Sequence, residues 1–284
     1  MTSLKSITPY KVKSFGLATD LFISSFESEV TERENYLVIK TPDQPGNFWG
    51  NFILFKNPPG AGDADTWMSI YRHEFKCKAP KFFAFKWDIS RLNLEKIKPF
   101  LEKGFHIHHD LVLSVEKIKK PGHYNNLLQI KMIKTAKEWC QVVDVHLDEE
   151  WKRSPHSQKE FMQKKVEVFR KFSREKLGCR FGAFKNNKLV GELGIYCHKD
   201  VGRLNLIATH RNYRRQGVCQ TLLYEAAKYA FDIMKLKHLV VIADRDYHAK
   251  KIYKTLGFKL KEKLSALLWY DNKHFYQSEL FYNF

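Results

Sequence analysis

The stretch that decides the fold runs from Leu204 to Phe258. It opens with Leu-Asn-Leu-Ile-Ala-Thr (204–209), continues with His-Arg-Asn-Tyr-Arg-Arg-Gln-Gly-Val-Cys (210–219) and leads into an apolar-striped segment that ends near Met234. A buried run, Leu-Val-Val-Ile-Ala (239–243), and the segment Asp-Tyr-His-Ala-Lys-Lys-Ile-Tyr-Lys-Thr-Leu-Gly-Phe (246–258) complete it. The pattern predicts a strand, a basic glycine turn, a helix, a strand, a second helix and a Gly-Phe ending.

The basic turn has the chemistry of an anion site. A helix should begin near Val218, because apolar residues follow at helical spacing: Leu222, Leu223, Ala226, Ala227, Ala230, Phe231 and Met234. The first N–H groups of a helix are unpaired and carry partial positive charge, which suits a phosphate. Gly217 leaves room for a ligand to approach the backbone, and Arg211, Arg214 and Arg215 add positive charge. Taken alone, the turn is equally consistent with a basic surface turn.

Two signatures in this stretch resemble those of the GCN5-related N-acetyltransferases, the GNAT superfamily. Arg-x-x-Gly-x-Cys (214–219) is similar to the family's Arg/Gln-x-x-Gly-x-Gly/Ala turn, which holds the pyrophosphate of coenzyme A. Asp-x-x-Ala-x-x-Ile-Tyr-x-x-x-Gly-Phe (246–258) is similar to the second signature, with Asp246 where Asn is usual. The two occur in the family's order, and the resemblance covers about residues 127–270.

The resemblance implies an acetyl-CoA-dependent N-acetyltransferase that uses no metal. It places coenzyme A against the following residues: Ile207, Ala208, Thr209, Arg214, Arg215, Gln216, Gly217, Val218 and Cys219. It assigns the general acid for the leaving thiolate to Tyr253, whose phenol is protonated at neutral pH. The alternative role for Tyr253 is that of a packing residue. Cys219 fills the small-residue position at the helix start, so we do not expect it to act as a nucleophile.

The general base stays open at this point. Glu192, in Val-Gly-Glu-Leu-Gly (190–194) on the strand before the arginine turn, is the first candidate. Asp244, His198 and His210 are other titratable groups at predicted strand ends, and each also has a structural or exposed interpretation. A base that acts through water, or no base, is also common in the family.

The predicted fold class is α/β (α+β), with two GNAT-like lobes at residues 1–121 and 122–284. Each lobe should be a mixed, mostly antiparallel sheet flanked by helices. From about residue 127 the patterns predict a strand, two helices, three antiparallel strands, a helix, a strand, a helix and a strand. The resemblance implies that the central parallel strands, 205–209 and 239–243, splay apart at the cofactor.

The N-terminal half repeats part of this plan. Phe-Leu-Glu-Lys-Gly-Phe (100–105), before a predicted strand, is similar to Tyr-Lys-Thr-Leu-Gly-Phe (253–258) and suggests a degenerate internal duplication. Residues 47–55 are predicted as one buried strand, and Asp63 is predicted to cap a helix after the loop at 58–62. The half lacks the arginine-glycine turn. We therefore expect a lobe without a cofactor site, similar to the first lobe of some bacterial tandem proteins of the family.

Charge and cysteine usage limit the function classes. Of the net charge of +18, residues 1–121 carry +4 and residues 122–284 carry +14. A basic surface attracts an anion such as coenzyme A, although a charge surplus usually reflects only solubility. Five scattered cysteines without a C-x-x-C pair, no long apolar run and no signal peptide predict a cytoplasmic protein without a membrane partner or structural zinc.

Two function classes remain. The first is the enzyme, whose partners are coenzyme A and a primary amine acceptor that the sequence does not identify. The second is a non-catalytic acyl-CoA-binding sensor or scaffold. A basic nucleic-acid-binding protein is a weaker third, and no specific nucleic-acid partner is expected because its motifs are missing. Tyr253 beside an intact turn favours the enzyme, and the sequence allows a homodimer.

Overall fold

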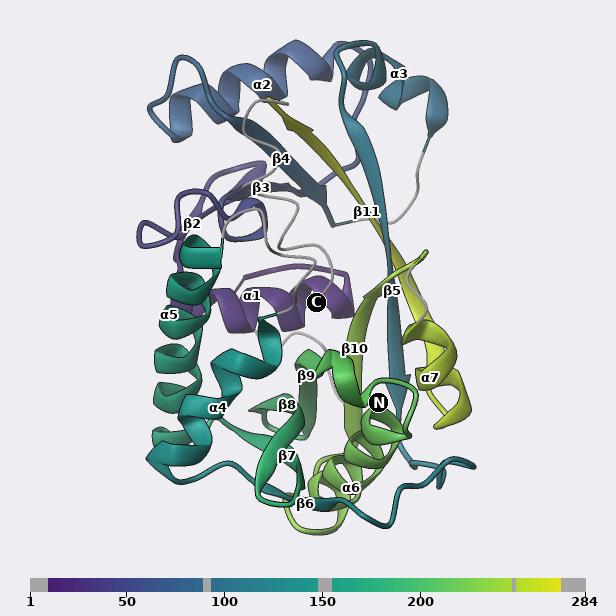
Figure 1. The fold of residues 1–284 in the computed structure, drawn as a ribbon. Coiled ribbons are helices and arrows are strands. Elements are labelled where there is room, and N and C mark those ends of the chain that lie inside the picture. Colours follow the sequence, from purple (N-terminus) through teal and green to yellow (C-terminus); the bar gives the residue numbers. More distant parts are fainter. Residues whose placement is uncertain (1–9, 89–92, 148–154, 247–248, 272–284) are drawn as a thin grey trace. The chain divides into compact units, whose positions relative to one another are not determined.

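The computed structural model of the chain describes residues 10–88, 93–147, 155–246 and 249–271 (Figure 1). These residues form two compact units. The first unit consists of residues up to Leu111 together with those from Glu262 onward, and the second unit is Val112–Lys261. The division lies ten residues from the expected boundary at 121/122. It also returns the end of the last strand to the first unit, because that strand pairs with a strand far away in the sequence.

The first unit contains a mixed sheet in the order β1-β2-β3-β4-β11. β3 and β4 run parallel, and the other neighbouring pairs are antiparallel. Its elements are α1 (Phe15–Glu27), β1 (Glu29–Glu32), β2 (Tyr36–Lys40), β3 (Phe52–Phe55), α2 (Asp63–Glu74), β4 (Phe82–Trp87), α3 (Leu94–Glu102), the first part of β5 (His106–Val115) and most of β11 (Lys259–Tyr270).

Aromatic packing sets the layers of the first unit. Trp67 of α2 stacks on Phe55 of β3, with ring centroids 3.7 Å apart, and contacts Phe85 of β4 at 5.5 Å. The next residue of β4, Lys86, points the other way and pairs with Asp20 of α1 at 3.4 Å. Because successive side chains of a strand point to opposite faces, α1 and α2 cover opposite faces of this sheet.

The strand predicted at residues 47–55 is too long. Phe48–Gly50 form a 3₁₀ turn, and β3 begins at Phe52. The buried side chain of Asn51 explains the break, because its amide donates to the carbonyls of Gln44 and Asn47 while its oxygen accepts the N–H of Thr41. These bonds hold the chain in a turn where the apolar pattern indicates a strand.

The second unit has the element order that the sequence predicts. Its elements are β6 (Gln129–Met132), α4 (Ala136–His146), α5 (Pro155–Arg174), β7 (Gly178–Lys185), β8 (Lys188–His198), β9 (Val201–Thr209), α6 (Val218–Asp232), β10 (His238–Asp244) and α7 (Ala249–Thr255), followed by the start of β11. The strand order is β10-β9-β8-β7-β6. β9 and β10 run parallel, and the other neighbours are antiparallel.

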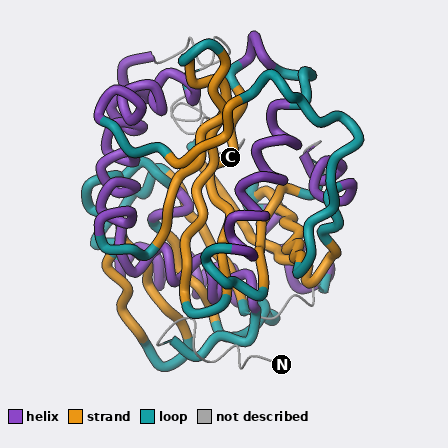
Figure 2. Tube along the Cα trace, turned by 90° about the horizontal axis from the view of Figure 1, so that it is seen from below, coloured by secondary structure: helices purple, strands orange, loops and turns teal. Residues whose placement is uncertain are grey.

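Helices cover both faces of this sheet. The guanidinium of Arg180 on β7 lies 3.9 Å from the ring centroid of Phe169 on α5. The next residue, Phe181, contacts Tyr229 of α6, with centroids 5.2 Å apart. Consequently α5 and α6 lie on opposite faces. Figure 1 shows α4 and α5 on one side of β7–β9 and α6 on the other, and Figure 2 shows helices on both sides of the strands.

The Gly-Phe similarity between the two halves has a structural basis. Gly104 and Gly257 have φ values of +86° and +99° and end α3 and α7 in the same way. In each case the following Phe donates its N–H to a residue five positions earlier: Phe105 to the carbonyl of Phe100 at 3.0 Å, and Phe258 to that of Tyr253 at 3.1 Å. Phe100 therefore holds the position in the first unit that Tyr253 holds in the second.

Candidate functional site

The central strands of the second unit diverge where the sequence analysis places the cofactor. β9 and β10 pair only through Val201–Arg203 and His238–Val240, although β9 continues to Thr209 and β10 to Asp244. Ile207, Ala208 and Thr209 lie in the diverging part of β9. The splayed parallel strands implied by the resemblance are therefore present.

β9 also contains a bulge in this part. Asn205 pairs with Gly194 of β8 and Ala208 pairs with Glu192, so Leu206 and Ile207 together face one residue of β8. Leu206 has a φ of +49°, which costs a residue with a side chain about 1 kcal/mol or more. No glycine marks the bulge, and no local pattern in the sequence predicts it.

The basic turn leads from β9 into α6. Gly217 caps the 15-residue helix with a φ of +75°, so the helix begins at Val218 as predicted. Arg214 donates through Nε to the carbonyl of Thr209 at 3.4 Å, and the side chains of Arg214 and Arg215 are exposed. The turn thus brings the N–H groups of the first helical turn together with two guanidinium groups, an arrangement that suits a diphosphate.

Gly217 is also required by the chain itself. A Cβ at this position would lie 2.6 Å from the carbonyl oxygen of His123, a distance that real Cβ atoms essentially never show. The segment around His123 is held on α6 by Asn125, which donates its side-chain amide to the carbonyl of Gln216 at 2.8 Å and its N–H to the hydroxyl of Thr221 at 2.8 Å. Ligand approach, the reason expected from the sequence, is therefore only one requirement for glycine here, and the contact with residues 123–125 leaves no local signal in the sequence.

Tyr253 comes from α7 and is 5% exposed. Its ring lies 5.8 Å from that of Phe258, within the helix-Gly-Phe arrangement that ends α7. Ring packing and the backbone hydrogen bond that ends α7 therefore fix the position of the Tyr253 ring. The packing and proton-donor roles of Tyr253 are compatible with each other.

Glu192 has surroundings that do not suit a general base. Its side chain is completely buried, and Nε of Arg180 donates to Oε2 at 2.6 Å while Nη2 contacts Oε1. Nε2 of His146, at the end of α4, also contacts Oε1. Burial by itself would raise the pKa of Glu192, but Arg180 and His146 outweigh it and hold the pKa below its usual value. Because both oxygens are engaged inside the fold, Glu192 is a poor candidate to take a proton from a substrate amine.

The other candidate residues serve local structure. Asp244 accepts the N–H of Asp246 at 2.6 Å, and Nδ1 of His210 accepts the N–H of Asn212 at 3.3 Å. His198, half-buried, ends β8. Burial raises the pKa of the Cys219 thiol to about 12, so the thiol stays protonated at neutral pH. None of these contacts identifies a base.

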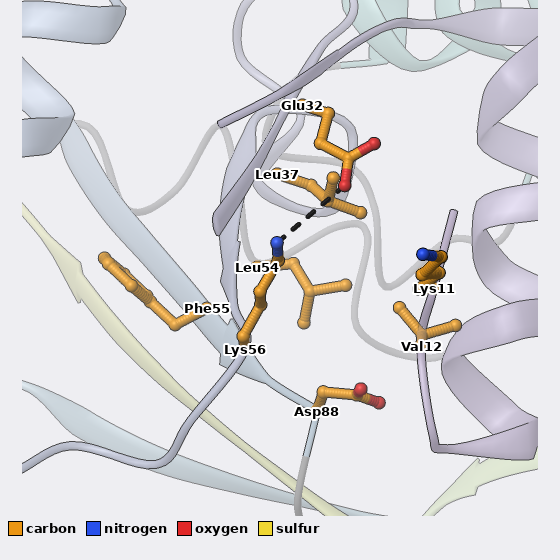
Figure 3. A pocket seen from close by; sticks show the side chains of 8 residues that line it. All are labelled: Lys11, Val12, Glu32, Leu37, Leu54, Phe55, Lys56 and Asp88. Carbon is orange, nitrogen blue, oxygen red and sulfur yellow. Dashed lines mark ion pairs between the residues drawn. The ribbon is translucent and has the colours of Figure 1, made fainter. Parts of the chain in front are cut away.

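Three further features of the described residues limit the kind of site that they can form. No group of three or more His, Cys, Asp or Glu side chains among them could hold a metal ion. No described helix is both long and apolar enough to cross a membrane. The cavity in Figure 3 lies in the first unit, beside the 3.8 Å ion pair of Lys56 and Glu32, and encloses about 10 Å³. That volume holds about one water molecule, so this cavity is too small for a coenzyme.

Comparisons with known proteins agree with this geometry. Residues 143–258 match the model of the Acetyltransferase (GNAT) family. A functionally unknown conserved protein from Staphylococcus epidermidis ATCC 12228 has a similar structure, with a TM-score of 0.69 and 14% identity over 87% of this chain and 95% of its own. A GCN5-related N-acetyltransferase from Kribbella flavida gives a TM-score of 0.60 and 15% identity over 89% and 92% of the two chains.

A tandem GNAT protein from the clavulanic acid biosynthesis pathway gives a TM-score of 0.56 and 11% identity over 89% of this chain and 87% of its own. At such identities the structural likeness shows a shared fold. No curated protein matches the chain in sequence. The family match runs from the last turn of α4 to the Gly-Phe ending of α7 and includes the turn, the diverging strands and Tyr253. Residues 143–258 therefore form a domain of the Acetyltransferase (GNAT) family, and the chain shares its fold with GCN5-related N-acetyltransferases.

Proposed function

We propose that the chain is an acetyl-CoA-dependent N-acetyltransferase whose second unit transfers an acetyl group to a primary amine. One observation carries the proposal: the Gly217 turn opens α6 directly after the part of β9 that diverges from β10. A cosubstrate with an anionic diphosphate and an amide-containing arm fits such a site. The N–H groups at the start of α6 suit the diphosphate, and the backbone groups of β9 that do not pair with β10 suit the amides of the arm.

In this proposal the basic turn and β9 bind different parts of acetyl-CoA. The N–H groups of Val218 and Cys219, with the side chains of Arg214 and Arg215, hold the diphosphate. The backbone of Ile207–Thr209 holds the pantetheine arm and the thioester carbonyl. The exposed arginines and the positive φ of Gly217 support the first assignment, and the diverging strands support the second.

The reaction needs little from the protein beyond placement and one proton. The neutral amine attacks the thioester carbon, a C–N bond forms and the C–S bond breaks. The sulfur takes a proton from the hydroxyl of Tyr253, the amine releases its proton to water, and Tyr253 regains a proton from water. We do not assign this second proton to Glu192, because Arg180 and His146 engage both of its oxygens.

Thiol release from acetyl-CoA, measured with a panel of amines, tests the function. Catalytic release with at least one small amine, amino acid or peptide amine is expected. Tight acetyl-CoA binding without turnover on any of them would support the sensor alternative. A wild-type protein that does not bind acetyl-CoA in calorimetry would refute both readings.

We expect one coenzyme A per chain, because the first unit blocks its own equivalent of the turn. Gly62, with a φ of +80°, caps α2 much as Gly217 caps α6. There the carboxylate of Asp63 accepts the N–H of Gly60 at 2.6 Å, so a negative charge already lies where a phosphate would bind. Phe100 replaces the phenol of Tyr253 in this unit. Calorimetric titration that saturates at two molecules per chain would contradict this expectation.

A further inference from the structure

We infer that Arg180, Glu192 and His146 form a buried clamp that sets the conformation of the β9 bulge and thereby positions the backbone N–H of Ile207. The geometric part of this inference concerns the second unit alone. Its catalytic consequence rests on the proposed function. The three residues are positioning residues, since none is placed against a substrate.

The clamp reaches the bulge through one hydrogen bond. Nη2 of Arg180 donates to the carbonyl oxygen of Leu206 at 3.2 Å. Leu206 is the residue with a φ of +49°, in the part of β9 where two residues face one of β8. A trans peptide is planar and its C=O and N–H point in opposite directions, so fixing the carbonyl of Leu206 also fixes the N–H of Ile207.

Arg180 is itself held on several sides. Glu192 binds the guanidinium through Nε and Nη2, and the ring of Phe169 lies 3.9 Å from its central carbon. Gly194 leaves the space for it, because a Cβ there would lie 2.6 Å from Nη1. A planar fork confined in this way can place a donor with a precision that a flexible ammonium lacks.

His146 extends the clamp to α4. Both Glu192 and the ring of His146 are fully buried, and an ionised carboxylate can only accept, so Nε2 of His146 carries the proton in their contact. The chain of contacts therefore runs from α4 through β8 and β7 to the bulge of β9. The four elements contribute His146, Glu192, Arg180 and the carbonyl of Leu206, in that order.

Stability alone does not account for such a cluster. Burying charged groups carries a large desolvation cost, and replacing a buried ion pair with apolar residues is often neutral or stabilising. Nη1 of Arg180 adds to this cost, because it is buried without a hydrogen-bond partner among the described residues. A guanidinium that orients the carbonyl of Leu206 in the bulge gives a physical reason for Arg at position 180.

Hydrogen–deuterium exchange tests the clamp without any ligand. Arg180→Lys keeps the charge but removes the fork, and Glu192→Gln keeps the shape but removes the charge. Both should speed amide exchange across residues 204–209 by about tenfold or more. Arg33→Lys is the matched control, because it breaks a bidentate pair with buried Glu74 in the first unit and should leave this segment unchanged.

Binding of acetyl-CoA and of free coenzyme A tests the consequence. Arg180→Lys should weaken acetyl-CoA binding by about tenfold relative to coenzyme A, because only acetyl-CoA carries the thioester carbonyl that the N–H of Ile207 is proposed to bind. His146→Gln, which keeps a donor toward Glu192, should retain more of this preference than His146→Leu. If Arg180→Lys fails to fold, Glu192→Gln carries the same comparison.

Two results would overturn the clamp. One is unchanged exchange at residues 204–209 in folded Arg180→Lys or Glu192→Gln protein. The other is an equal loss of affinity for acetyl-CoA and coenzyme A, which would indicate a purely structural role. A wild-type protein that binds neither ligand would instead reject the proposed function, and the exchange experiment would still decide whether the clamp holds the bulge.

Discussion

Tyr253→Phe is expected to lower the rate of acetyl transfer by roughly 10²–10⁴-fold, the usual contribution of a positioned general acid. The substitution removes the hydroxyl and keeps the ring that packs 5.8 Å from Phe258. The first unit shows that Phe fits this helix-Gly-Phe arrangement, because Phe100 holds the equivalent position and is completely buried. Acetyl-CoA affinity should change little, since the proton is needed only as charge develops on sulfur.

The measurement should be a single-turnover rate with an accepted amine, so that chemistry limits the signal. Tyr229→Phe is the matched control, because its half-buried ring packs on Phe181 from α6 and it has no role in the proposed reaction. A Tyr253→Phe protein with the wild-type rate would remove Tyr253 from the mechanism. A loss of affinity at an unchanged rate would make it a binding residue instead.

Gln216→Glu should weaken acetyl-CoA binding by at least about tenfold, equivalent to about 1.4 kcal/mol. The substitution is nearly isosteric and adds one negative charge between Arg215 and the start of α6, where the diphosphate is proposed to bind. It keeps the bond from Asn125 to the carbonyl of residue 216 and removes the exposed bond that Nε2 of Gln216 donates to the carbonyl of Asn212. The effect should shrink at high salt, because dissolved ions shorten the Debye length and screen the repulsion between the new carboxylate and the diphosphate.

Calorimetry at low and high salt measures this change, with Gln163→Glu on the exposed surface of α5 as a control of equal charge. Gly217→Glu is a less specific probe. Its side chain would start 2.6 Å from the carbonyl of His123, and its backbone would need a φ of +75°, so lost affinity would mix repulsion with a displaced turn. Wild-type affinity in Gln216→Glu would place the diphosphate elsewhere.

Local sequence patterns predicted most of the helices and strands. The strand predicted at residues 204–209 and the helix start at Val218 are found where the sequence predicts them, and Asn186 and Asn187 form the turn between β7 and β8. Each depends on interactions within a few residues: side-chain alternation, a glycine that tolerates positive φ, and two Asn residues with φ of 51° and 61°. Where a side chain competed with the pattern, as Asn51 does before β3, the strand boundary was wrong.

The sequence by itself determined the match of residues 143–258 to the GNAT family, the order of elements in the second unit and the turn that begins α6, because these features are encoded in contiguous residues. The tertiary structure alone decided the rest. Glu192 became a clamp residue when folding brought it to Arg180, 12 positions away, and to His146, 46 positions away. The carbonyl of His123 leaves no room for a Cβ at Gly217, which is a second requirement for glycine there. Most of β11 belongs to the first unit because it pairs with β4. Contacts between distant segments leave no local periodicity, so only the folded chain reveals them.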